Sequence, residues 1–192
     1  ESILYEAHPH LGTDKLPGII SSVRKAILDA GGEIFFERRI DNILTENKTV
    51  KGVLFAGNEK YLCNNLILAT GHSARDVYDI CRSAGITLVM KPFAMGVRVE
   101  HPQVLIDKIR YHGNERGKYL PAASYNIVRQ VDGRGVYSFC MCPGGYIVPS
   151  ATSSEEVVVN GMSPSGRSSP FANSGIVVEI KPGDLAKYQR FG

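Results

Sequence analysis

The sequence predicts an α/β unit followed by a β-rich second half. Three patterns support this fold class: apolar residues recur at helical spacing over residues 13–30, a short continuous apolar run at residues 66–69 ends in a glycine turn, and apolar and polar residues alternate after residue 90. The pattern changes after residue 85, where the α/β unit is followed by the β-rich half.

Residues 13–30 are expected to form the first helix. Thr13 or Asp14 can cap its N-terminus, and Pro17 is tolerated because the first helical N–H groups have no partner within the helix. Two glycines, at positions 31 and 32, end the helix. The apolar residues at helical spacing are Ile19, Ile20, Val23, Ile27 and Leu28.

A series of short strands is expected after this helix. The candidates are residues 33–37, 40–45 and 50–55, and a Gly57-Asn58 turn then leads into Tyr61-Leu62. The tripeptide Asn47-Lys48-Thr49 lies between two of these strands and also matches a glycosylation sequon. Because nothing in the sequence indicates secretion, we interpret the tripeptide as a turn.

The continuous apolar run Leu66-Ile67-Leu68-Ala69 suits a strand that is covered on both faces, as in a parallel sheet. It is followed by Thr70-Gly71-His72, and then Ser73 and Asp76 form a capping box that opens a helix to about residue 83. Such a turn presents free backbone amides and the positive end of a helix dipole, which attract an anion. The same sequence also suits an ordinary strand-to-helix turn, so both interpretations stay open.

A nucleophilic interpretation of the same turn is weaker. Residues 71–75 partly match the G-x-S-x-G elbow of α/β-hydrolases, with Ser73 as the nucleophile. That elbow needs a small residue where Arg75 stands, because strand and helix pack closely there. We therefore favour Ser73 as a helix cap.

The second half is expected to be rich in β-strands. Alternation over residues 96–100 places Arg98 and Glu100 on one face of a strand and two valines on the other. A short helix is expected over residues 102–110, and Asp132-Gly133-Arg134-Gly135 indicates a hairpin. The other expected elements are strands at 125–129, 136–141, 146–148, 157–159 and 176–180 and a long loop at 160–175.

Two cysteines, Cys140 and Cys142, are expected to share one face of a strand. The C-x-C spacing is poor evidence for zinc, and a disulfide between strand positions i and i+2 would be strained. The pair is therefore either two small packed side chains or a redox-active or substrate-facing pair. No metal site is expected, because no metal-type spacing joins His8, His10, His101 and His112.

The composition excludes several classes of protein. The 22 Lys and Arg residues exceed the 19 Asp and Glu residues by only three, which is too little for a nucleic-acid footprint. No apolar run approaches the roughly 20 residues of a membrane span. Four cysteines are too few for a disulfide scaffold, so a cytoplasmic setting is expected. The chain begins at Glu1 without a signal segment, and we interpret it as a piece of a longer protein.

Several blocks of the sequence resemble FAD-dependent flavoproteins. The run from Leu66 to Gly71, with the preceding helix that ends in Gly-Gly-Glu, resembles the second FAD-contacting motif of glutathione-reductase-type flavoproteins. Longer blocks look like a group of bacterial FAD-dependent dehydrogenases, and together they extend over nearly the whole chain. These blocks are residues 8–16, 69–76, 91–102, 135–145 and 160–163.

The resemblance implies a doubly wound FAD/NAD(P)-binding domain, of which residues 1–85 would be a part, followed by a β-rich α+β inserted domain at 86–192. Carried over by motif, Ala69, Thr70 and Gly71 would lie close to the dinucleotide, with His72 and Ser73 beside them. The block that holds His8, His10, Thr13 and Asp14 would face the flavin or the substrate.

The candidate substrate-side residues are Arg98, His101, Cys140 and Cys142. Arg98 could bind an anionic group of a small-molecule substrate, and the two cysteines could be redox-active or merely packed. The substrate, the oligomeric state and the use of NADH or NADPH as a further partner are left open.

One departure from the flavoprotein pattern is large. The G-x-G-x-x-G turn after a first strand, with an acidic residue about 20 positions later, is not found in these 192 residues. We therefore expect the chain to bind FAD weakly or not at all, whereas the longer parent binds it. The alternative to an oxidoreductase is a non-catalytic binding or assembly module.

Overall fold

The structure is a computed structural model that describes residues 10–113 and 115–188. The chain divides into two compact units. Unit 1 joins the residues up to Ala30 with Pro92–Lys181, and unit 2 joins Gly31–Lys91 with the residues from Pro182 onward. The expected domain boundary at residues 85 and 86 stays a prediction.

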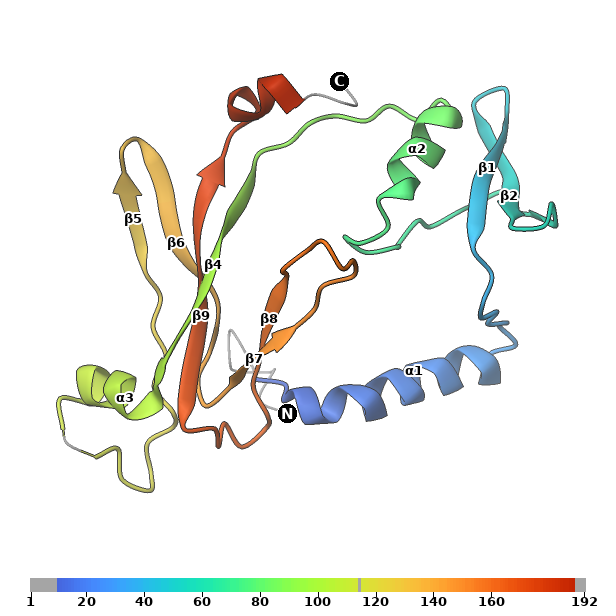
Figure 1. The fold of residues 1–192 in the computed structure, drawn as a ribbon. Helices are drawn as coiled ribbons and strands as arrows, with labels where there is room; N and C mark the ends of the chain where they lie inside the picture. The colour runs from blue at the N-terminus through green and yellow to red at the C-terminus, as the bar shows by residue number, and fades with distance from the viewer. Residues whose placement is uncertain (1–9, 114, 189–192) are drawn as a thin grey trace. The chain divides into compact units, whose positions relative to one another are not determined.

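The centre of unit 1 is a four-stranded antiparallel sheet with the strand order β4-β9-β6-β5. Its strands are β4 (Phe93–Pro102), β5 (Val128–Val131), β6 (Arg134–Cys142) and β9 (Phe171–Ile180). Figure 1 shows the long strands β4 and β9 side by side. The turn between β5 and β6 has positive φ at Asp132 and Gly133, which confirms the predicted hairpin.

Smaller elements complete unit 1. Helix α3 (Gln103–Tyr111) follows β4 directly, and strands β7 (Tyr146–Pro149) and β8 (Val159–Met162) form a two-stranded sheet. The prediction of a strand at 157–159 followed by a loop to residue 175 is largely wrong, because β8 starts only at Val159 and β9 already starts at Phe171. The pairing of β8 with β7 and of β9 with β4 sets these boundaries. The serine- and glycine-rich sequence gives no local indication of this pairing.

The N-terminal part of unit 1 holds a short 3-10 helix, η2 (Thr13–Lys15), and helix α1 (Leu16–Asp29). Gly31, with a φ of 80°, follows the end of α1 as predicted. The predicted cap is wrong, because Lys15 occupies the N-cap position without a side-chain bond and Asp14 binds elsewhere. No residue of α1 is buried, so its apolar side is exposed in the described structure.

Unit 2 begins with an antiparallel meander of β1 (Ile40–Glu46), β2 (Thr49–Phe55) and β3 (Lys60–Leu62). The turn residues Asn47 and Lys48 both have positive φ, as a two-residue hairpin requires, so the predicted turn is confirmed. The buried hydrophobic residues of the meander are Ile43 and Val53. The unit also holds helix α2 (Asp76–Ser83), which buries Cys81, and a short 3-10 helix, η3 (Pro182–Tyr188).

Two strand predictions in unit 2 are wrong. Residues 33–37 and 66–69 do not form strands, and the side chain of Ile67 is 91% exposed. A continuous apolar run becomes a buried strand only between neighbouring strands, and the described strands of this unit pair among themselves. The observed class is therefore α+β with antiparallel sheets, and the doubly wound sheet stays a prediction for the parent protein.

Candidate cofactor and substrate sites

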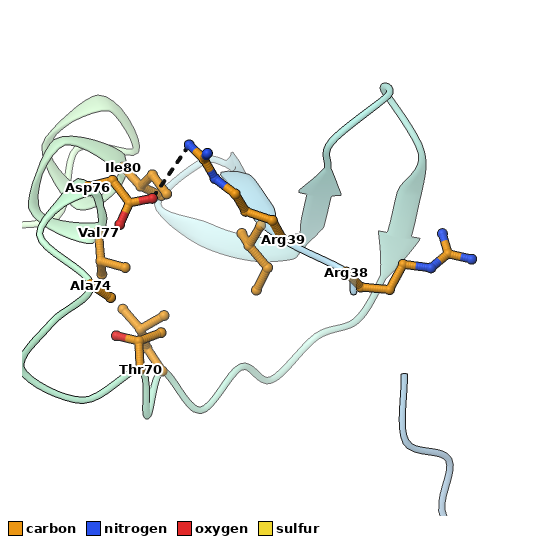
Figure 2. Close-up of a pocket in the computed structure, with 9 residues that line it drawn as sticks. Arg38, Arg39, Thr70, Ala74, Asp76, Val77 and Ile80 are labelled. Carbon is orange, nitrogen blue, oxygen red and sulfur yellow. Dashed lines mark ion pairs between the residues drawn. The ribbon is translucent and has the colours of Figure 1, made fainter. Parts of the chain in front are cut away.

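A pocket in unit 2 contains the best-placed of the predicted cofactor residues. It has a volume of about 210 Å³ and lies between α2 and the segment that leads into β1 (Figure 2). Thr70 and Asp76 line it together with a floor of aliphatic side chains. The complete lining is Arg38, Arg39, Ile40, Leu68, Thr70, Ala74, Asp76, Val77 and Ile80.

The charges at this pocket are arranged around Arg39. Its Nη2 lies 3.5 Å from Oδ2 of Asp76, the pair marked in Figure 2, and its Nε lies 3.5 Å from Oδ1 of Asp41. Arg38 points away from Thr70 and pairs with Glu59. Exposed ion pairs of this kind contribute at most about 1 kcal/mol, so the Arg39 guanidinium can exchange its partner for a bound anion at little cost.

The five predicted cofactor residues do not all meet in this pocket. Thr70 lines it, whereas Ala69, Gly71, His72 and Ser73 are exposed beside it. Gly71 has a φ of 74°, a conformation that favours glycine at this turn. The roles of all five residues stay predictions.

Ser73 is not the helix cap that the sequence predicted. Arg75 is the N-cap residue of α2 and makes no side-chain capping bond, while Oγ of Ser73 lies 3.3 Å from Nε2 of His72. Within the described residues no carboxylate contacts His72, so this pair lacks the third member of a catalytic triad. The geometry gives the hydrolase interpretation no support.

In unit 1, Arg98 and the two cysteines of the C-x-C motif come together. Nη1 of Arg98 donates to the carbonyl oxygen of Cys140 at 3.0 Å and to Oδ1 of Asn173 at 2.6 Å. Cys140 has a φ of 45°, and the pairing of β6 with β9 is interrupted between Phe139 and Cys142. This bulge directs the Cys140 carbonyl toward the Arg98 guanidinium. It also interrupts the strand alternation, on which the prediction that Cys140 and Cys142 share one face was based.

The two thiols of this cluster differ in exposure. Cys140 is exposed, and Cys142 is half-buried and donates to the Cys140 carbonyl at 3.4 Å. Burial raises the pKa of the Cys142 thiol, and the positive charge of Arg98 offsets only part of this effect. Cys142 is therefore protonated at neutral pH, which is the opposite of an activated nucleophile.

His101, the fourth predicted substrate-side residue, lies on the other face of β4. Alternation along the strand separates it from Arg98, and its Nε2 is hydrogen-bonded to the Tyr125 hydroxyl at 2.7 Å. Burial raises the pKa of Tyr125, with smaller opposing contributions from Ser174 and Arg98. The four candidates thus form two separate groups.

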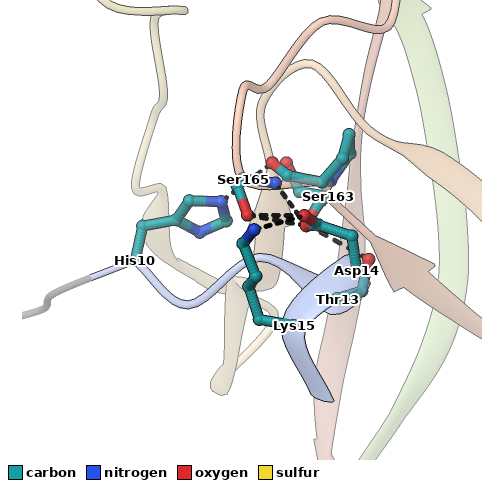
Figure 3. A network of polar contacts seen from close by, with 7 residues as sticks. His10, Thr13, Asp14, Lys15, Ser163 and Ser165 are labelled. Carbon is teal, nitrogen blue, oxygen red and sulfur yellow. Dashed lines mark hydrogen bonds and ion pairs between the residues drawn. The ribbon is translucent and has the colours of Figure 1, made fainter. Parts of the chain in front are cut away.

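The N-terminal block holds a loop of unit 1 in place (Figure 3). The Asp14 carboxylate accepts from the backbone N–H and the hydroxyl of Ser165, both at 2.7 Å, and these bonds lower the pKa of Asp14. The His10 ring donates to the Pro164 carbonyl at 3.0 Å, and the Thr13 N–H donates to the Ser163 carbonyl at 3.0 Å.

Glycine at position 12 allows the N-terminal block to lie close to the loop that holds Ser165, because a Cβ there would overlap the Ser165 backbone. The expectation that His10, Thr13 and Asp14 face the flavin or the substrate stays a prediction. His8 lies outside the described residues.

Sequence reasoning missed the buried polar residues that fix unit 1. Asn173 is fully buried and binds Arg98, and its Nδ2 has no hydrogen-bond partner among the described residues. Gln103 donates to Asp107 at 2.9 Å and accepts from the Gly144 N–H at 2.7 Å, while Asp107 accepts from the Ala123 N–H at 2.8 Å. Polar residues in a helix or strand look like surface residues in the sequence, so no local signal reveals them.

The described residues define an α+β protein whose antiparallel sheets are compatible with the C-terminal domain of a larger protein. Residues 92–191 match the family described as FAD-dependent protein, C-terminal domain-like, and the chain belongs to this family. An uncharacterized protein of Clostridium beijerinckii is similar to it, with 40% identity over 185 residues. The alignment covers 95% of the chain and 34% of the relative, so the chain spans about a third of that relative's length.

The family match confirms that the chain is related to FAD-dependent proteins. The narrower resemblance to glutathione-reductase-type flavoproteins stays a prediction. Among the helices that the structure describes, none is long and apolar enough to span a bilayer.

Proposed function

We propose that the chain is part of an FAD-dependent oxidoreductase of the dehydrogenase type that acts on a small molecule in the cytoplasm. The observation that carries the proposal is the family match over residues 92–191. FAD supplies the redox chemistry when bound, and the protein binds, orients and shields the reactants. Whether NADH or NADPH takes part is left open, and neither nucleic acid nor a membrane belongs to the proposal.

The pocket beside Thr70 suits one part of the cofactor. The Arg39 guanidinium and the Thr70 hydroxyl offer hydrogen-bond donors to an anionic or polar group, and the aliphatic floor suits a flat ring. Its volume of about 210 Å³ is below the roughly 300–1,000 Å³ of pockets for drug-sized ligands, so it fits only part of a dinucleotide. This supports our proposal that the chain alone binds FAD weakly and that the parent supplies the remaining contacts.

Arg98 is the residue best suited to orient an anionic substrate group. Two hydrogen bonds hold Nη1, and a guanidinium has five N–H donors in all, so donors remain for a carboxylate or phosphate oxygen. The same bonds fix the guanidinium on the bulge of β6, next to the exposed Cys140 thiol. Cys140 and Cys142 keep both of their proposed roles, as packed side chains or as a redox pair.

The cofactor half of the proposal can be tested by FAD titration of the flavin-stripped parent protein. Arg39→Gln should weaken FAD binding by about tenfold, the loss expected for one charge-assisted hydrogen bond. The matched control is Lys60→Gln, which removes a positive charge from an exposed residue of β3 that does not line the pocket. Equal FAD affinity in both variants would remove the pocket from the proposed cofactor site.

A second candidate function is favoured by one observation. The five apolar residues that recur at helical spacing in α1 are all exposed, which suits an assembly surface. A parent protein that takes up no FAD and loses its oligomeric state with Ile20→Asp would support the assembly module over the oxidoreductase.

A further inference from the structure

Unit 1 contains a groove on the sheet face that carries His101. It has a volume of about 690 Å³ and lies beside α3. Leu105, Ile106 and Ile109 of α3 form one wall, and Val99, Ile127 and Ile176 of the sheet and its flanking segment form the opposite side. The volume lies within the roughly 300–1,000 Å³ range of small-molecule pockets.

The walls of the groove leave large apolar side chains in contact with water. Leu105 and Ile127 are about half exposed, and Ile109 is 62% exposed. Covering such side chains with an apolar molecule removes their surface from water and is favourable. The hydrophobic effect therefore favours a ligand with an apolar body.

The formal charge among the residues that line the groove is the positive charge of Arg110. Arg110, from the last turn of α3, lines the groove and makes no ion pair within the described residues, and no aspartate or glutamate is among the lining residues. The hydrogen-bonded pair of His101 and Tyr125 adds a second polar point within the same groove. An occupant complementary to this groove combines an apolar body with one anionic group.

We propose that this groove binds a small apolar carboxylate, with its hydrocarbon part on the isoleucine- and leucine-lined walls and its carboxylate at Arg110. The site uses no residue of the pocket beside Thr70, and its ligand need not be the substrate of the flavin reaction. The proposal therefore stands or falls separately from the FAD-dependent function.

The test is isothermal titration of the full-length parent with decanoate below its micelle-forming concentration. We expect one saturable site per chain and weaker binding of decanol, which lacks the charge. Arg110→Gln should weaken decanoate binding by about fivefold or more, because it removes the charged partner of the carboxylate. The matched control, Lys108→Gln, removes a charge from the same helix turn at a residue that does not line the groove and should leave binding unchanged.

A second variant guards against indirect effects of the first. Ile109 is exposed, so Ile109→Asp should fold, as circular dichroism can verify, and it places a carboxylate inside the groove. Decanoate binding should then be lost. Binding that survives Ile109→Asp, equal binding to the Gln variants of Arg110 and Lys108, or no saturable binding to the parent would each overturn the proposal.

Discussion

Arg98 and Thr70, the central residues of the two proposed sites, differ in how this chain holds them. Arg98 lies in the middle of β4, which pairs with β9 over its full length, and two hydrogen bonds fix its guanidinium. Thr70 follows an apolar run that forms no strand and leaves Ile67 91% exposed. The pairing of β4 with β9 fixes the position of the Arg98 side chain through the strand register. The segment before Thr70 is not paired, so strand pairing does not fix the position of the Thr70 side chain.

The largest loss of stability should come from substitution of Asp107, a buried residue whose hydrogen bonds hold parts of unit 1 together. Asp107→Ala leaves the Ala123 N–H without its partner, removes one of the two hydrogen bonds that the Gln103 amide nitrogen donates, and removes the buried neighbour of Arg116. We expect a loss of about 3 kcal/mol or more of unfolding free energy, measured by urea denaturation.

Asp132→Asn is the control for this experiment, because Asp132 is exposed in a hairpin turn with positive φ, which asparagine tolerates. If both variants unfold at the same urea concentration, the buried network is not what holds unit 1 together.

A smaller loss of stability is expected from substitution of Gly161, which lies against the side chains of Arg98 and Asn173. A Cβ at this position would overlap Nη1 of Arg98 and Oδ1 of Asn173, so Gly161→Ala must displace the guanidinium. We expect a loss of about 1–3 kcal/mol in thermal unfolding, together with faster alkylation of Cys142 as its packing loosens.

The control is Gly166→Ala, because a Cβ there meets nothing within 4 Å. Unchanged stability and unchanged Cys142 alkylation in Gly161→Ala would show that the guanidinium is not held where the structure has it.

The smallest effect concerns the bonds between Asp14 and Ser165. They lower the pKa of Asp14 below its ordinary 3.8, so their contribution to stability is complete above that pH and is lost as the pH falls through the lowered folded-state pKa. Ser165→Ala should raise the pKa of Asp14 toward its ordinary value in a carboxyl NMR titration. Ser153→Ala, in an exposed loop, should not, and an identical titration curve in all three proteins would contradict the network.

Local patterns in the sequence were enough to predict the first hairpin of unit 2, helices α1 and α2, and the β5–β6 hairpin. In the two hairpins the turn residues adjoin the strands that they join, as Asn47 and Lys48 do, and in the two helices the apolar spacing lies within the segment itself. The failures are non-local. Strand β8 depends on pairing with β7, and no strand that the structure describes pairs with the apolar run at 66–69.

The candidate sites show the same limit. Arg98 and His101 were both predicted on the substrate side, although they lie on opposite faces of β4, and nothing in the sequence indicates that Asn173, 75 positions later, binds the Arg98 guanidinium. The pocket beside Thr70 likewise needs Arg39, which precedes it by a whole meander. Contacts between distant segments follow from packing, which a single sequence does not display.

The most direct test of the central claim is the visible absorption spectrum of the purified full-length parent beside that of this 192-residue chain, after incubation of both with FAD and removal of free cofactor. We expect a bound-flavin band in the parent and a weak band or none in the chain, with circular dichroism confirming that the chain is folded. A parent that stays colourless after this treatment would contradict the assignment as an FAD-dependent oxidoreductase.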